Sequence, residues 1–304
     1  MRPRTAALVV GLALVGGCGG GESGSKGGDA PPGSLNALWD RPGPNVALVP
    51  GTNTFVPGEV RFTFLVVRDD GSLVERPTAR VWLARGLKQR PFQEGEAALE
   101  EIDAPGGVHA HAGDHPARLY VARVEVPAPG TYWLLAEPAG ARIQGVATLE
   151  VKARSPSPGV GERAIPSETP TLETAGGDLA AVSTSSKPVP ALYRHSIAES
   201  LAAGAPFVVT FATPKFCTSR TCGPVVDVVD AVRRELAGSG LRFIHVEVYE
   251  GNDPTRGYNR WMREWKLTTE PWVFVVGRDG RIAERFEGAV SVRELRAAAS
   301  RAAR

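Results

Sequence analysis

Apolar residues recur with different spacings along the chain, and each spacing predicts a different kind of element. Between about residues 45 and 152, short apolar runs alternate with polar residues and end at Pro/Gly turns, as in 60–67 (VRFTFLVV). Alternation of this kind is typical of β-strands. Later in the chain the apolar runs are continuous, at 206–211 and 271–276, or have helical spacing, at 223–236. The pattern therefore predicts a β-rich part followed by a part that mixes buried strands with helices.

The β-rich part has strands of similar length, which predicts a β-sandwich over residues 45–152. This segment resembles the immunoglobulin-like domains of bacterial envelope proteins. Residues 153–190 are rich in Pro, Ser, Thr and Gly, which predicts a linker and the start of a second domain. The rest of that domain is expected to span residues 191–304.

The N-terminus has the pattern of a targeting signal. Two arginines precede an apolar stretch at 6–15, which is too short to span a bilayer as a stable helix. The sequence Leu14-Val15-Gly16-Gly17-Cys18 then resembles the lipobox of bacterial lipoproteins. The resemblance implies a signal peptide over 1–17 and a lipidated, flexible tether over 18–44. Diacylation of Cys18 would anchor the protein extracytoplasmically, on the outer face of the bacterial cytoplasmic membrane. An ordinary secretory signal is the alternative.

The charge balance bears on the partners that the protein could have. The chain has 35 basic and 33 acidic residues, and its formal net charge is +2. Removal of residues 1–17 would take away two arginines and leave 33 residues of each sign. A balanced charge does not favour a nucleic-acid surface, so no nucleic-acid partner is expected.

The strongest chemical signal is the stretch from Phe207 to Val232, which reads as a strand, a turn with two cysteines and an amphipathic helix. A helix N-terminus lowers the pKa of a nearby thiol and favours a reactive thiolate. Cys217 and Cys222 are five residues apart, which on an ideal helix separates their Cα atoms by about 8.7 Å, more than the roughly 7 Å that a disulfide allows. Pro224 favours a helix that begins near Gly223 and leaves Cys217 in the loop, so that the pair can form. Arg220 lies between the two cysteines, where it either stabilises a thiolate or is a solvated side chain.

The second domain resembles the thioredoxin superfamily. The resemblance rests on the cysteine turn, on Thr268-Thr269-Glu270-Pro271 before a strand, and on Arg278-Asp279-Gly280-Arg281 with Phe286-Glu287-Gly288. It implies a two-domain fold class, an all-β immunoglobulin-like sandwich followed by an α/β thioredoxin fold. It also implies that Pro271 is cis and faces the cysteines. The chain departs from the family in having four residues between the cysteines and in having Thr210 where many members bury an acidic residue.

The resemblance implies a membrane-anchored thiol–disulfide oxidoreductase with Cys217, Cys222 and Pro271 as its catalytic residues. Either cysteine could be the nucleophile. The expected partners are exported protein thiols or disulfides, or a membrane electron donor, and no cofactor is expected beyond the Cys217–Cys222 disulfide. Three alternatives stay open: copper delivery to a respiratory oxidase, peroxide reduction, and a binding protein with a structural disulfide. Similar copper chaperones use a downstream histidine, and His245 is the histidine that follows the pair.

A histidine cluster in the β-rich part is a separate candidate site. His109, His111 and His115 lie within seven residues, together with Asp114. On a strand, His109 and His111 would point the same way. Such a cluster could bind copper or zinc in an oxidising compartment. The alternative reading is a polar surface loop.

Overall fold

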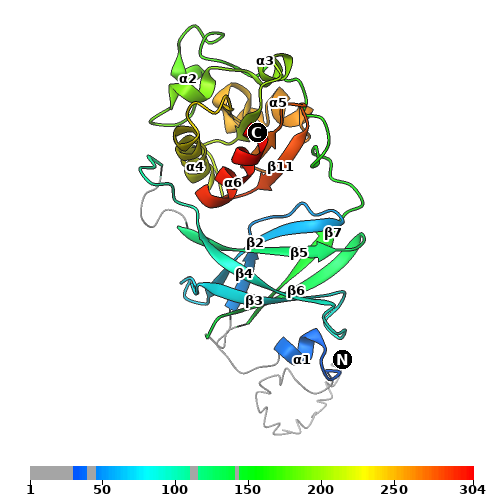
Figure 1. Cartoon of the computed structure of the whole chain (residues 1–304). Coiled ribbons are helices and arrows are strands. Elements are labelled where there is room, and N and C mark those ends of the chain that lie inside the picture. The colour runs from blue at the N-terminus through cyan, green and yellow to red at the C-terminus, as the bar shows by residue number, and fades with distance from the viewer. Residues whose placement is uncertain (1–29, 40–45, 110–115, 141–143) are drawn as a thin grey trace, which may run out of the picture.

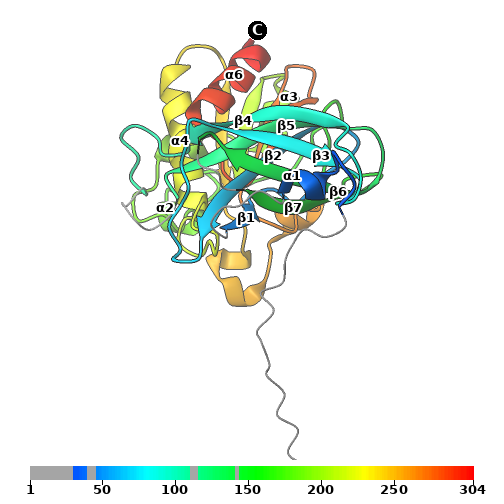
Figure 2. The same cartoon turned by 90° about the horizontal axis from the view of Figure 1, so that it is seen from below.

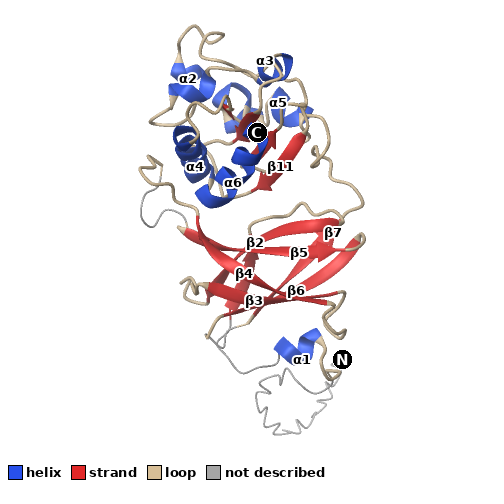
Figure 3. Cartoon of the chain, viewed as in Figure 1, coloured by secondary structure: helices blue, strands red, loops and turns tan. Residues whose placement is uncertain are grey.

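The computed structural model describes residues 30–39, 46–109, 116–140 and 144–304. These residues form eleven strands in two sheets, with helices mainly in the second half of the chain (Figures 1 and 3). We call residues 46–151 the barrel region and residues 155–304 the C-terminal region. Figure 2 looks along the stack of the two regions, with the barrel strands in front of helices α4 and α6. Within the described part of the chain, no helix is both long and apolar enough to cross a membrane.

The elements occur in the following order along the chain. The first half has α1 (Leu35–Trp39), β1 (Val46–Pro50), β2 (Gly58–Arg68), β3 (Thr78–Ala84), β4 (Gln93–Glu101), β5 (Arg118–Val126), β6 (Gly130–Pro138) and β7 (Gly145–Val151). The second half has α2 (Leu179–Val182), α3 (Ile197–Ala202), β8 (Phe207–Phe211), α4 (Cys222–Glu235), β9 (Arg242–Val246), α5 (Arg260–Glu264), β10 (Trp272–Val276), β11 (Ile282–Glu287) and α6 (Val292–Ala303). Short 3₁₀ helices span Pro190–Tyr193, Glu250–Asn252 and Pro254–Arg256.

The barrel region is a single seven-stranded sheet in the order β1-β2-β5-β4-β3-β6-β7, with antiparallel pairing throughout. The sheet curls until its two edges approach each other, because a Cβ on Gly145 of β7 would lie 3.0 Å from the Cβ of Leu48 of β1. Aromatic side chains fill the interior, and the ring centroids of Phe64 and Tyr120 are 5.1 Å apart. The buried Tyr120 hydroxyl donates to the Val74 carbonyl at 3.0 Å, which satisfies its polar group in the core.

The fold class expected from the sequence was wrong. In place of an immunoglobulin-like sandwich followed by an α/β thioredoxin fold, the chain is mostly β, with two sheets of which the larger is nearly closed and barrel-like. One physical reason is β4, which the sequence analysis missed because QEGEAALEE has little apolar alternation. β4 pairs with both β3 and β5 and so joins the strands into one sheet.

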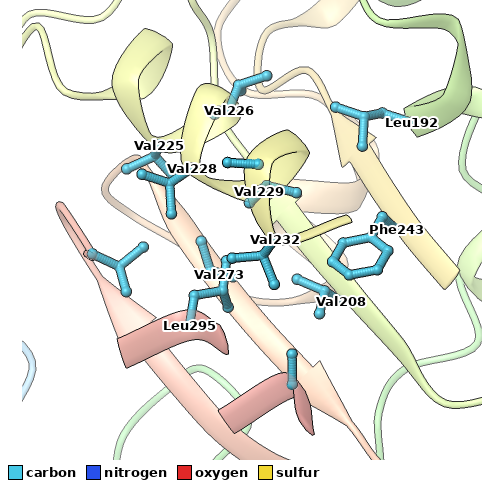
Figure 4. Close-up of a cluster of buried hydrophobic side chains, with 14 of the residues drawn as sticks. Leu192, Val208, Val225, Val226, Val228, Val229, Val232, Phe243, Val273 and Leu295 are labelled. Atoms are coloured by element: carbon cyan, nitrogen blue, oxygen red, sulfur yellow. The ribbon is translucent and has the colours of Figure 1, made fainter. Parts of the chain in front are cut away.

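The C-terminal region contains a four-stranded sheet in the order β11-β10-β8-β9. β8 and β9 are parallel, whereas the other neighbouring pairs are antiparallel. Every residue of β8 and β10 is buried, because both faces of these strands are covered. Val208 and Val273 pack against α4 and α6 on one face (Figure 4), and the opposite face packs against α3, α5 and Trp265. The valines of α4 recur at helical spacing, which explains why this helix lies on the sheet.

Residues 155–190, which their composition suggests are a linker, follow the surface of the C-terminal region. The Gly161 N–H donates to the Ile282 carbonyl at 2.8 Å. Further along, the Arg285 guanidinium donates to the Ser157 hydroxyl at 3.1 Å and to the Pro158 carbonyl at 3.0 Å. These bonds extend the C-terminal region beyond its sheet and helices.

Charged side chains join the two regions. Arg61 of β2 makes a bidentate ion pair with Glu294 of α6, with both N···O distances at 2.8 Å and exposed side-chain fractions of 9% and 5%. Arg61 also donates to the Ala289 carbonyl at 2.9 Å. A second pair joins Arg293 of α6 to Glu100 of β4. Since α6 makes both pairs, its first turn is one point at which the barrel region contacts the C-terminal region.

We expect Arg61→Ala to lower the free energy of unfolding by about 3–5 kcal/mol, because it removes the bidentate partner of the buried Glu294 carboxylate and leaves Arg123, 4.0 Å away. Urea denaturation of the two proteins gives the difference. Arg80→Ala is a matched control, since it removes an arginine from the exposed Arg80–Glu94 pair of the same sheet. The control should change stability much less. Equal losses in the two variants would contradict the role given to Arg61.

Candidate functional site

The two cysteines lie at the N-terminus of α4, between β8 and the helix. The helix begins at Cys222, and Thr221 at its N-cap makes no side-chain capping bond. Instead, the Cys222 N–H donates to the Cys217 sulfur at 3.3 Å. The first N–H groups of a helix lack acceptors within the helix. The Cys217 sulfur therefore accepts the hydrogen bond that a side-chain oxygen at the N-cap would usually accept.

This arrangement lowers the pKa of Cys217 to about 6, from an ordinary value of 9.0. The largest cause is a hydrogen bond from the Cys222 thiol, and burial opposes it. The Ser219 hydroxyl, 3.2 Å from the sulfur, and the N–H groups of Cys222 and Thr221 lower the pKa further. Each of these groups donates a hydrogen bond to the thiolate, which favours the charged form. Near neutral pH, Cys217 is therefore mostly a thiolate.

Cys222 has the opposite environment. Its side chain is fully buried, and burial raises its pKa well above the ordinary value. The hydrogen bond that it donates to Cys217 raises it further, because that bond needs the proton on Cys222. Both cysteines are free thiols in this structure. The pair thus contains one ionised, half-buried sulfur and one protonated, buried sulfur.

Arg220 and Cys217 line one open pocket of about 710 Å³. The backbone of Arg220 has a φ of 59°, and its N–H donates to the Cys217 carbonyl at 3.3 Å. The groups named above as lowering the pKa of Cys217 are hydroxyl, thiol and backbone donors, whereas Arg220 adds a positive charge to the wall of the pocket. Its backbone bond closes the tight turn that carries Cys217.

The Glu270–Pro271 peptide bond is cis and comes directly before β10. A second, more apolar pocket of about 360 Å³ lies between the two regions. Ser219 and Thr221 of the cysteine loop line it, as do Thr269 and Glu270 before the proline. The remaining wall comes largely from apolar residues of the barrel region, including Val49, Leu65, Ile102 and Leu119. The cysteine loop and the loop before Pro271 therefore border one cleft.

Glu287 connects the barrel region to the loop that precedes Pro271. One of its carboxylate oxygens accepts from the backbone N–H groups of Asn53 and Thr54, at 3.1 and 2.8 Å. The other accepts from the Thr269 hydroxyl at 2.9 Å, and that same hydroxyl oxygen accepts from the Trp272 indole N–H at 3.0 Å. In the sequence, Glu287 belongs to a hairpin motif, and this role could not be predicted because Asn53 and Thr54 are more than 200 residues away.

A buried carboxyl lies near the cysteines at a position that the sequence analysis also missed. Burial raises the pKa of Glu247 to about 7. One oxygen accepts from the Thr184 N–H and hydroxyl at 2.6 and 2.9 Å, while Oε2 is buried and has no hydrogen-bond partner among the described residues. The Thr213 hydroxyl, 3.5 Å from that of Thr184, lowers the pKa of this carboxyl, and the Thr213 backbone lowers that of Cys222, although burial outweighs both effects. In the sequence, the position of Glu247 inside the apolar run LRFIHVEVY could have indicated a buried carboxyl. Thr210, by contrast, donates to the Trp272 carbonyl at 3.2 Å.

The predicted histidine site is described only at His109. Its two ring nitrogens contact Asp227 Oδ1 at 2.7 Å and Ser185 Oγ at 2.6 Å. His111 and His115 lie outside the described residues, as does the predicted lipidation site Cys18. Within the ranges that the structure describes, no three His, Cys, Asp or Glu side chains are placed to hold a metal ion together. Metal binding by this cluster stays a prediction.

His245, the histidine considered for copper delivery, is buried in β9. Its Nδ1 is 2.5 Å from the Tyr193 hydroxyl, and its Nε2 is 3.0 Å from the Ala212 carbonyl. Burial lowers its pKa to about 4, so the ring is neutral near pH 7. Both nitrogens are used by the protein core, which makes His245 a structural residue in this arrangement.

Comparison with known proteins gives no family for this chain. No family model matches it, and no curated protein matches it. Among solved structures, it has a likeness to the solution structure of the PKD domain from the human VPS10 domain-containing receptor SorCS2. The sequence identity is 16% and the TM-score is 0.20, over 48% of this chain and 98% of that chain. A likeness at this TM-score carries no argument about this chain.

We expect iodoacetamide to modify Cys217 at a rate that is nearly constant above pH 7 and falls about tenfold per unit below pH 6. The sign follows from the pKa of about 6, because the thiol is protonated as the pH falls through that value. Mass spectrometry of the modified peptide gives the rate for each cysteine. Cys222 should react only after unfolding. A Cys217 profile that still rises between pH 7 and 9 would contradict the assignment.

Replacing Ser219 by Ala should raise the pKa of Cys217 by up to about one unit, because one donor to the thiolate is lost. The thiolate absorbance at 240 nm, followed against pH, measures the change. Thr218→Ala, one residue earlier in the same exposed turn, is the matched control and should leave the pKa within about 0.3 units. The same shift in both variants, or none in Ser219→Ala, would show that the hydroxyl does not stabilise the thiolate.

Proposed function

We propose that this protein is a thiol–disulfide oxidoreductase in which Cys217 is the nucleophile and Cys222 resolves the intermediate. The observation that carries the proposal is the asymmetry of the pair. Cys217 has a pKa of about 6 and opens onto a pocket, while the Cys222 thiol is buried and has a raised pKa. Nucleophilic attack requires a thiolate that a substrate can reach, and of the two sulfurs only Cys217 meets both conditions.

The reaction exchanges two sulfur–sulfur bonds. The Cys217 thiolate attacks one sulfur of a substrate disulfide, forms a mixed disulfide and releases the other substrate sulfur as a thiolate. Cys222 then loses its proton and attacks the Cys217 sulfur. This step releases the second substrate thiolate and forms the Cys217–Cys222 disulfide. The substrate disulfide is reduced and the cysteine pair is oxidised, so the two electrons and the bonds balance.

Proton transfer from Cys222 is the step that burial makes costly. Thr213 influences the pKa of both Cys222 and Glu247, and the Glu247 pKa of about 7 lets that carboxyl take up a proton near neutral pH. Glu247 is therefore the proposed proton acceptor for the second step.

The copper-delivery alternative needs a third ligand besides the two cysteines. His245 has both ring nitrogens hydrogen-bonded inside the core, and His109 has both of its own bonded to Asp227 and Ser185. These observations favour thiol–disulfide exchange over copper delivery. A purely structural disulfide is disfavoured by the lowered pKa of Cys217, because stabilising the thiolate makes the disulfide easier to reduce.

The location and partners follow from the N-terminal sequence and complete the proposal. A chain anchored through diacylated Cys18 would work on the outer face of the cytoplasmic membrane, where exported proteins carry thiols and disulfides. Exported thiols or a membrane electron donor would return the pair to its reduced form. The cysteine pair itself serves as the redox group, without a further cofactor.

We expect Cys222→Ser to accumulate a mixed disulfide at Cys217, because the resolving thiol is missing. Incubation with a disulfide-containing unfolded protein, followed by non-reducing gels and mass spectrometry, detects the adduct. Cys217→Ser is the matched control and should form no adduct, since the buried Cys222 cannot be reached. Adducts on Cys222 in that control, or none in either variant, would refute the assigned roles.

A further inference from the structure

A second group of reactive side chains lies where the barrel region meets α4. His109, on the loop after β4, is held between Asp227 of α4 and Ser185, on the segment after α2. The distance from His109 Nδ1 to Asp227 Oδ1 is 2.7 Å, and that from His109 Nε2 to Ser185 Oγ is 2.6 Å. The His109 and Asp227 side chains are 10% and 4% exposed, while Ser185 is half-buried. None of the three takes part in the proposed cysteine chemistry.

The Asp227 carboxylate indicates which ring nitrogen of His109 donates. Burial alone raises the pKa of Asp227, but the hydrogen bonds from the His109 ring and N–H outweigh it and hold the pKa below its ordinary value. An ionised carboxylate only accepts, so His109 Nδ1 carries the proton. When the ring is neutral, Nε2 is an acceptor and can receive a hydrogen bond from the Ser185 hydroxyl. The Lys187 N–H donates to the Ser185 oxygen at 3.0 Å, which leaves that hydroxyl free to donate to the ring.

Further contacts hold His109 and Asp227 in place. Asp227 Oδ2 accepts the His109 backbone N–H at 2.8 Å, so one carboxylate holds both the ring and the main chain of that residue. The ring also packs against Gly223, where an added Cβ would lie 2.7 Å from the His109 Cβ. Glycine at this position thus lets the loop approach the start of α4. The arrangement is rigid on the side of His109 and Asp227 and open on the side of Ser185.

The open side faces the 710 Å³ pocket that also contains Cys217. Ser185 and His109 line it together with Gly223 and Arg220. Gly223 lies in the first turn of α4, where backbone N–H groups have no acceptor within the helix. Such N–H groups and the positive charge of Arg220 favour negative charge that develops in the pocket.

We propose that Ser185, His109 and Asp227 form a Ser-His-Asp acyl-transfer site that hydrolyses small carboxylic esters. Such a site is recognised by geometry and roles, whatever the fold and the chain order. Ser185 Oγ attacks the ester carbonyl while its proton passes to His109 Nε2. The carbonyl oxygen takes the negative charge, the C–O bond to the alcohol breaks, and the alcohol leaves with the proton from His109. Water then attacks the acyl-serine with His109 as base, which releases the acid and restores Ser185. Asp227 is the positioning residue for the ring.

A fluorophosphonate probe tests the proposal on the full chain, because it modifies an activated serine covalently. We expect one modification per chain, at Ser185 by peptide mass spectrometry. Ser185→Ala should lose it, whereas Ser186→Ala, the neighbouring serine, should keep it. Asp227→Asn should slow the modification by about 100-fold or more, because the amide favours the wrong ring tautomer.

Circular dichroism and thermal unfolding show whether each variant is folded, and Asp227→Asn keeps the size and one acceptor oxygen of the native residue. Hydrolysis of p-nitrophenyl acetate gives an independent readout, which should fall in Ser185→Ala and not in Ser186→Ala. Three results would overturn the proposal: no modification of the wild-type chain, modification at another serine, or a rate that folded Asp227→Asn leaves unchanged. Any of these would make the group a structural clamp between the two regions.

Discussion

Hydrogen bonds hold the first two turns of helix α4 at their start and on one side. The cysteine pair and the Ser185–His109–Asp227 group both depend on the position of these two turns. At the start, the Cys222 N–H donates to the Cys217 sulfur, so the helix terminus and the thiolate stabilise each other. On the side, Asp227 accepts from the ring and the backbone of His109. The helix packs against the sheet through its buried valines, which are Val225, Val228, Val229 and Val232. A shift of α4 would therefore weaken both groups together.

The barrel region contributes to the cysteine site through buried charges. Glu287 bonds to the barrel loop at Asn53 and Thr54 and also to Thr269, two residues before the cis proline. Arg61 and Glu294 form a bidentate pair at the first turn of α6. Removing one partner of such a buried pair is destabilising, because it leaves an uncompensated charge. The same Glu294 is part of the capping box at Ser291. The position of the loop before Pro271 thus depends on residues far away in the sequence.

Local features could be read from the sequence, whereas the assembly could not. The continuous run at 206–211 and the helical spacing at 223–236 gave β8 and α4 nearly at their observed bounds, because burial on a sheet leaves a direct pattern. β4 has no such pattern. Because it pairs with a strand on each side, the strands form one curled sheet and not the predicted sandwich. The contacts of His109 with Asp227 and of Glu287 with Thr54 join residues more than 100 positions apart. No spacing rule reaches that far, so these contacts required the structure.

The reduction potential of the Cys217–Cys222 pair tests the central claim most directly, because the account rests on a stabilised Cys217 thiolate. A pKa of about 6 instead of 9.0 favours the reduced pair about tenfold at pH 7, which corresponds to about 30 mV for a two-electron couple. Equilibration of the protein with thiol–disulfide buffers, with the free thiols counted by mass spectrometry, gives the potential. The account predicts a value above about −300 mV, in the range of exchangeable disulfides. A value below about −300 mV would identify a structural disulfide and contradict the proposed function.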